Sequence, residues 1–140
     1  MSEQNKTIVQ RYIEEVYNQG NVNLVDELVA ADYVNSGGLS DQRPGSEGLK
    51  QFIPQLRTIF PDEHLTIENL IAEGDMVAYR WIARGTHKAE MMGVPPTDKQ
   101  ITATGISIVR IADGKIVEEW TSRDDLSVMQ QLGIIPPDTE

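Results

Sequence analysis

Asp124 is the residue of this sequence whose type and position best suit acid/base chemistry. It stands four positions after Trp120, in the stretch ITATGISIVRIADGKIVEEWTSRDD (101–125). A carboxylate beside an indole in an apolar pocket has a raised pKa, because loss of water disfavours the charged form. Such a group can take a proton from a carbon acid near neutral pH and return it. We predict Asp124 as this base; the alternative is that Asp124 or Asp125 caps the helix that follows, and both roles hold if one aspartate caps and the other faces the pocket.

His87 is the second candidate for chemistry. It ends an alternating segment and shares a face with Tyr79 and Trp81. As a hydrogen-bond donor it could stabilise an oxyanion or an enolate, or it could be a histidine at a strand end in water. With two histidines, no cysteine and no helical metal-binding spacing, we expect no metal site and no thiolate chemistry.

The stretch 101–125 predicts a β-hairpin that turns at Asp113-Gly114. If this turn is two residues long, Ala112 pairs with Lys115 and the rest of the register follows. One face then carries three cross-strand pairs: Ser107 opposite Trp120, Gly105 opposite Ser122, and Ala103 opposite Asp124. The small side chains of the first strand, Ala103, Gly105 and Ser107, would leave a hollow beside Trp120 and Asp124, and Ser107 would line this hollow. The alternative is an ordinary sheet edge, with small residues for close packing.

Aromatic side chains could supply the walls of that hollow. Tyr79, Trp81 and Trp120 lie on the same predicted sheet face, and Tyr12 lies on the apolar face of the first predicted helix. We predict them as contacts of a small apolar molecule; ordinary core packing is the alternative.

The elements that position these residues are helices first and strands second. Apolar residues at helical spacing predict three helices. The first covers 2–18, the second is short and is capped by Asn21, and the third is capped by Ser46. We expect a kink or a local break in the third helix at Pro54. Alternation then predicts strands over 65–71 and 76–87 before the hairpin, and a helical turn over 125–133. We expect Tyr33-Val34 to form a short strand or an extended segment and 35–45 to form a loop. The segment IIPPDTE (134–140) is expected to be a tail. This order predicts an α+β fold, in which a curved antiparallel sheet wraps around the N-terminal helices as a cone with a ligand site at its mouth.

Length and charge limit the remaining possibilities. The 140 residues fit a single domain over 1–140. The net charge of 12 − 22 = −10 argues against nucleic acid and anionic membrane surfaces as partners. No apolar run is long enough to cross a membrane and the N-terminus lacks a signal-peptide pattern, so we expect a cytoplasmic protein. The outward β-branched face of the sheet suggests a homodimer, or a higher homo-oligomer, formed sheet to sheet.

Several segments together resemble the SnoaL-like polyketide (ester) cyclases of the nuclear-transport-factor-2-like superfamily. The matching segments are FPD (60–62), EGDMVAYRW (73–81), GTH (85–87), GVPPT (93–97), IVRIADGKIVEEW (108–120) with Asp124, and QQLG (130–133). The resemblance spans nearly the whole chain and is densest from Phe60 to Gly133.

The resemblance implies a cone-shaped α+β barrel, usually oligomeric, with a pocket between helices and sheet. Characterised members close a ring in a polyketide methyl ester by an intramolecular aldol reaction, without metal or cofactor. By this resemblance Asp124 is the acid/base and His87 faces the pocket. A histidine that family members commonly carry after a Tyr-Val pair is missing after Tyr33-Val34, so Asn35 or Ser36 is predicted as its replacement.

Three functions therefore remain in view. The first is a cyclase that uses Asp124 as base on a small carbonyl substrate. The second is a non-catalytic protein that binds a small apolar molecule. The third is another reaction on the same scaffold, such as isomerisation or hydrolysis.

Overall fold

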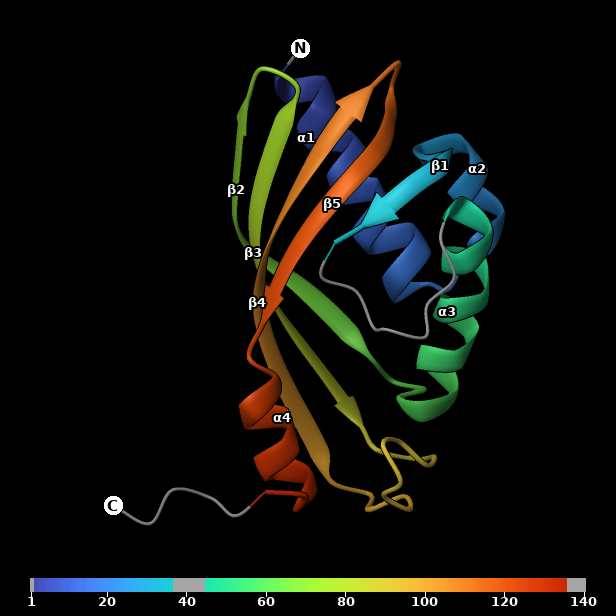
Figure 1. The fold of residues 1–140 in the computed structure, drawn as a ribbon, viewed down its shortest axis with the longest axis vertical. Coiled ribbons are helices and arrows are strands. Elements are labelled where there is room, and N and C mark those ends of the chain that lie inside the picture. The colour runs from blue at the N-terminus through green and yellow to red at the C-terminus, as the bar shows by residue number, and fades with distance from the viewer. Residues whose placement is uncertain (1, 37–44, 136–140) are drawn as a thin grey trace.

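The computed structural model describes residues 2–36 and 45–135. Its N-terminal helices lie along one side of a five-stranded sheet, and its C-terminal helix lies apart from them at the lower end of the molecule (Figure 1). Most of the predicted loop 35–45 and most of the tail 134–140 lie outside the described residues. The elements in chain order are α1 (Ser2–Arg11), the π-helix η1 (Tyr12–Asn18), the 3₁₀ turn η2 (Val22–Leu24), α2 (Val25–Leu28), β1 (Val29–Asn35), α3 (Gly45–Ile59), β2 (His64–Glu73), β3 (Met76–Thr86), β4 (Gln100–Ala112), β5 (Lys115–Arg123) and α4 (Asp125–Leu132). The predicted α+β class with helices first is confirmed.

The strand order is β1-β5-β4-β3-β2. β2 to β5 pair antiparallel in sequence order, and β1 pairs parallel with β5 at the sheet edge. The extended segment expected at Tyr33-Val34 is therefore a full strand. It begins at Val29, directly after the four-residue helix α2.

The first helical segment is amphipathic, and its last two turns have π-helical geometry. Tyr12, Ile13 and Val16 in η1 are buried against the sheet. α3 runs from Gly45 to Ile59 with Pro54 inside it, so the helix is not broken at the proline. α3 also begins one residue before the predicted cap, Ser46. Among the described residues no helix is long and apolar enough to cross a membrane.

β3 lies between β4 and β2 in the sheet and follows the predicted alternation. Its inward residues Val77, Tyr79, Trp81, Ala83 and Gly85 are buried. Alternation places them on the side of the sheet that faces the helices.

The β4–β5 hairpin turns where the sequence predicts, but its register changes after two pairs. Asp113 and Gly114 both have positive φ, 53° and 76°, as a type I′ turn requires. Ala112 pairs with Lys115 and Ile111 with Ile116, but Arg110 then pairs with Glu118. Val117 is thus an extra residue, a β-bulge.

This bulge turns over every later side chain of β5, because successive residues point to opposite faces. Ser107 lies opposite Thr121 and not Trp120, and Gly105 lies opposite Arg123 and not Ser122. The register predicted from the turn alone is wrong beyond Ile116. Glu119, expected on the outer face, is buried with 4% exposure, whereas Trp120 lies outside with 36% exposure.

Candidate functional site

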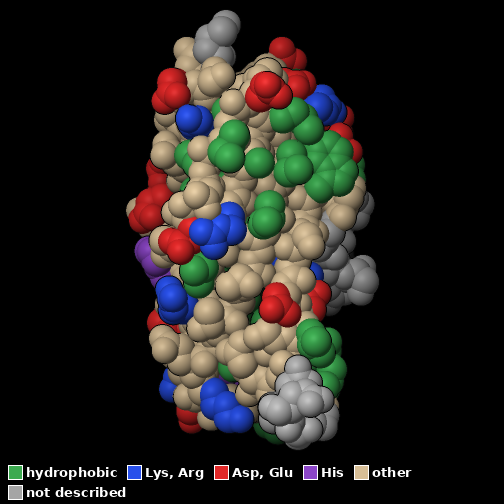
Figure 2. Space-filling model, turned by 90° about the vertical axis from the view of Figure 1, so that its left-hand side faces the viewer, with side chains coloured by type: hydrophobic (Ala, Val, Ile, Leu, Met, Phe, Trp, Pro, Cys, Tyr) green, Lys and Arg blue, Asp and Glu red, His purple; other side chains and the backbone are tan. Residues whose placement is uncertain are grey.

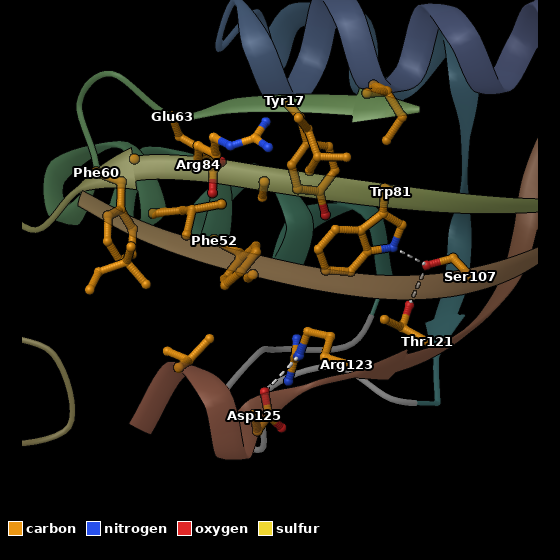
Figure 3. A pocket seen from close by; sticks show the side chains of 18 of the residues that line it. Tyr17, Phe52, Phe60, Glu63, Trp81, Arg84, Ser107, Thr121, Arg123 and Asp125 are labelled. Atoms are coloured by element: carbon orange, nitrogen blue, oxygen red, sulfur yellow. Dashed lines mark hydrogen bonds and ion pairs between the residues drawn. The ribbon is translucent and has the colours of Figure 1, made fainter. Parts of the chain in front are cut away.

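A pocket of about 200 Å³ lies between the helix-facing side of the sheet and the helices η1 and α3. Its wall is mostly apolar, with Ile13 and Tyr17 from η1 and Phe52 and Leu56 from α3. In Figure 3, Trp81, Ser107 and Thr121 lie toward one end, and Phe60 and Glu63 toward the other. The volume is below the ~300–1,000 Å³ usual for ligand sites.

The small residues of β4 make room for Trp81. Gly105 pairs directly with Trp81 across the strands. A Cβ at Gly105 would lie 2.8 Å from Cε2 of Trp81 and 2.9 Å from the backbone oxygen of Ser122, so only glycine fits there. The indole fills part of the predicted hollow, and Ala103 and Ser107 line what remains.

A chain of hydrogen bonds continues from this indole. Nε1 of Trp81 donates to Oγ of Ser107 at 3.1 Å, and the hydroxyls of Ser107 and Thr121 are 3.0 Å apart. Both hydroxyls belong to the pocket wall. They give the apolar pocket a polar point beside Trp81.

Glu119 lies next to this point and accepts hydrogen bonds from three tyrosine hydroxyls. Tyr12 and Tyr33 donate to its Oε1 at 3.2 and 2.7 Å, and Tyr79 donates to its Oε2 at 2.8 Å. The three tyrosines come from η1, β1 and β3, so the cluster exists only when helices and sheet are assembled. No ion pair joins Glu119 to a lysine or arginine within the described residues.

Burial raises the pKa of Glu119, and the hydrogen bonds from Tyr33, Tyr79, Tyr12 and Ser107 oppose this rise. Burial and the negative charge of Glu119 in turn raise the pKa of all three bonded tyrosines. The phenols therefore keep their protons, and the carboxyl is the group of the cluster that can take up or release a proton.

Glu63 is a second carboxyl in the pocket wall. Burial raises its pKa from 4.5 to about 7, although the charge of Arg57 acts in the opposite direction. Its Oε1 is buried without a hydrogen-bond partner among the described residues. A carboxyl with a raised pKa in the wall of a pocket is a candidate functional group.

Asp124 lies outside this pocket. It is exposed, it is the N-cap of α4, and its Oδ1 accepts a hydrogen bond from the backbone N–H of Ser127 at 3.0 Å. The prediction that Asp124 faces the hollow beside Trp120 is wrong, because the Val117 bulge moved the register and the chain leaves the sheet at Arg123. Asp125 instead lines the pocket and accepts from Nε of Arg123 at 3.3 Å. One aspartate caps and the other reaches the pocket.

His87 is buried with 0% exposure but is not part of the pocket wall. Its Nδ1 accepts a hydrogen bond from the backbone N–H of Thr97 at 3.2 Å and lies 3.0 Å from the hydroxyl of that threonine. An accepting Nδ1 puts the ring proton on Nε2, which has no partner among the described residues. The GTH and GVPPT segments are thus joined by a contact that fixes the connection between β3 and β4.

The other predicted contacts divide between the pocket and its surroundings. Tyr79, Trp81, Ser107 and Asn35 line the pocket. Tyr12 lies behind the wall and reaches the site through Glu119. Ser36 is exposed and donates its backbone N–H to the carbonyl oxygen of Glu119 at 2.8 Å, while Trp120 faces outward.

Sequence reasoning missed Glu119 and Glu63. A bulge at valine carries no glycine or proline signal, so nothing in the sequence marks the reversal that turns Glu119 inward. Glu63 stands in a turn, where polar residues are expected to be exposed. Within residues 2–36 and 45–135 no group of three or more His, Cys, Asp or Glu could hold a metal ion.

Comparison with known proteins gives the family. The family model for SnoaL-like polyketide cyclases matches residues 7–132. The nogalonic acid methyl ester cyclase of Streptomyces nogalater is 31% identical over 126 residues, which are 89% of this chain and 94% of that protein. The aklanonic acid methyl ester cyclase DnrD of Streptomyces peucetius is 30% identical over 129 residues, 90% of this chain and 88% of that protein.

Solved structures agree with this assignment. IdmH from Streptomyces antibioticus is 35% identical, with a TM-score of 0.79 over 93% of this chain and 99% of that one. AclR from Streptomyces galilaeus is 24% identical with a TM-score of 0.86 over 100% of this chain and 87% of that one, a likeness of fold alone. The family resemblance in the sequence segments is confirmed, and the chain belongs to the SnoaL-like polyketide cyclases.

Proposed function

We propose that the protein is a cofactor-independent cyclase that closes a ring in a small polyketide methyl ester by an intramolecular aldol reaction, with Glu119 as the acid/base. The observation that carries the proposal is the position of Glu119: a buried carboxyl in the wall of an apolar pocket, held by three tyrosine hydroxyls. The named activities of the two Streptomyces relatives supply the ester and the ring closure as the reaction to test.

The reaction needs no partner besides the substrate. Ionised Glu119 takes the proton from the carbon that lies between two carbonyl groups, and an enolate forms. That carbon bonds to a second carbonyl carbon of the same molecule, whose C=O π electrons move to oxygen. The new alkoxide lies next to the carbon that lost the proton, so Glu119 can return the proton to it. No atom and no electron is gained or lost overall.

The surroundings of Glu119 suit both halves of this cycle. The tyrosine hydroxyls hold the carboxylate in one orientation, which reduces the reorganisation needed for proton transfer. The Ser107 and Thr121 hydroxyls can rotate, so one of their hydrogens can turn toward a substrate oxygen. Burial raises the pKa of the carboxyl toward the working pH, where a general base is most effective.

The test is ring closure of nogalonic acid methyl ester by wild-type protein and by Glu119→Gln. We expect the variant to lose about 10²–10⁴-fold in kcat, the usual effect of a lost general base. It should also lose exchange of the substrate's acidic C–H with deuterium in heavy water. Glu118→Gln is the matched control, because it removes the same charge one position away on β5.

Asp124→Asn decides between this proposal and the acid/base role that the sequence predicts for Asp124. Asparagine caps a helix about as well as aspartate but cannot act as a base. Full turnover in Asp124→Asn with none in Glu119→Gln supports Glu119, and the reverse result assigns the reaction to Asp124. Ligand binding by the wild-type protein without product at any pH would instead identify a carrier.

We also propose that two copies associate through the outer face of the sheet. Ile106, Ile108 and Trp120 are exposed there, by 52%, 38% and 36%, and Ile108 pairs directly with Trp120. Figure 2 views this face and shows hydrophobic side chains gathered over its upper part. Ile108→Glu should change a dimer into a monomer in light scattering; an unchanged mass at equal concentration would refute this interface.

A further inference from the structure

Glu63 lies at a part of the pocket that the proposed reaction does not use. It precedes His64, which pairs with Arg84 on β3, whereas Glu119 bonds to Tyr79 on the same strand. From Tyr79 to Arg84 is roughly 16 Å along an extended strand. The α-carbon and the alkoxide of one aldol step are within a few bonds of each other, so Glu63 and Glu119 do not act on the same reacting atoms.

The surroundings of Glu63 are aromatic. All three aromatic side chains Tyr17, Phe52 and Phe60 line the pocket. In Figure 3, Phe60 lies at the same end as Glu63, Phe52 lies toward the middle, and Tyr17 lies nearer to Trp81. The backbone N–H of Glu63 donates to the carbonyl oxygen of Phe60 at 3.0 Å, which fixes the start of its side chain next to that ring. The space beside the carboxyl therefore suits a flat ring.

Oε1 of this carboxyl lacks a donor among the described residues. This oxygen is buried, and no ion pair in the described part of the chain includes the carboxyl. The charged or titratable groups around it are Tyr17 on η1, Arg57 on α3 and Arg84 on β3. Arg57 directs its guanidinium N–H to the backbone oxygens of Tyr17 and Asn18, each at 3.0 Å, and not to this carboxyl. A buried acceptor left without a donor costs free energy, which a ligand that supplies the donor recovers.

We propose that Glu63 is the recognition site for a hydroxyl group on an aromatic ring of the bound molecule, at the end remote from the reacting carbon. The ring lies between Phe52 and Phe60, and its O–H donates to the carboxylate of Glu63. A ligand with a free carboxylate at this point is disfavoured by like charge. The inference rests on the proposed function only in naming this molecule the substrate; the binding site stands on its own contacts.

The experiment compares 2-naphthol with 2-methoxynaphthalene, in which a methyl group replaces the hydroxyl hydrogen, by calorimetric titration at pH 8. We expect the wild-type protein to bind the naphthol at least about 10-fold more tightly than the methoxy compound, because a hydrogen bond to a charged group contributes about this difference in affinity. Glu63→Leu should bind both probes with equal affinity. Lowering the pH to 5 should narrow the preference in the wild type, because a protonated Glu63 can donate to the methoxy oxygen.

Glu119→Gln separates this inference from the proposed function. It should keep the preference for naphthol while losing ring closure. Equal affinities of the two probes for the wild type, failure of the wild type to bind either, or a preference that persists in Glu63→Leu would each overturn the inference. Loss of turnover in Glu119→Gln is unaffected by any of these results, so the two ideas fail separately.

Discussion

Replacing Glu63 by glutamine should change the pH dependence of stability in a defined direction. The folded protein raises the pKa of this carboxyl from 4.5 to about 7, so between these values the folded state holds a proton that the unfolded state has released. The free energy of unfolding of the wild type therefore falls as pH rises through this window. Glutamine does not titrate, so the free energy of unfolding of Glu63→Gln does not fall in this way as pH rises.

The size follows from the shift. One pKa unit corresponds to about 1.4 kcal/mol, so the rise from 4.5 to about 7 is worth about 3 kcal/mol at most. Glu63 is only half-buried, which lowers the expected value to about 2 kcal/mol. Glu63→Gln should thus match the wild type near pH 4.5 and exceed it by about that amount at pH 8.

Urea unfolding followed by tryptophan fluorescence, at half-unit pH steps from 4.5 to 8.5, measures this difference. Glu119 also has a raised pKa, but it is present in both proteins and cancels in the comparison. Glu68→Gln, an exposed position of β2, is the matched control for removal of one negative charge. A difference between Glu63→Gln and wild type that does not change with pH would refute the reasoning, since it would mean that Glu63 is solvated.

Three further predictions test other parts of the site. Gly105→Ala should destabilise the protein by about 1–3 kcal/mol, because the added Cβ meets the Trp81 indole and a backbone oxygen; an unchanged melting temperature would show that β4 can shift. Asp124→Ala should cost about 1 kcal/mol of stability through loss of the α4 cap, with turnover per folded molecule unchanged; loss of turnover in fully folded protein would contradict this. The kcat of the wild type should rise with pH through the raised pKa of Glu119, because the carboxylate is the active base, and a rate that only falls with pH would exclude this role.

The sequence determined the class of the fold and most of its elements. Apolar residues at helical spacing before Ile59 and alternating residues after Leu65 require a layer of helices on one face of a sheet. Asp113-Gly114 fixed the turn because both positions need positive φ, which few residue pairs tolerate. Helical spacing, strand alternation and turn type depend on neighbouring residues and can therefore be predicted from the sequence.

Only the tertiary structure decided which carboxyl enters the pocket. The extra residue at Val117 reverses the faces of β5, and no local signal separates a bulged valine from a regular one. Glu119 then becomes buried because three tyrosines from three different elements meet it there, and Asp124 becomes a cap because the strand ends one residue before it. Burial and pairing between distant segments set these positions and the pKa values that follow from them, and such contacts exist only once the chain has folded.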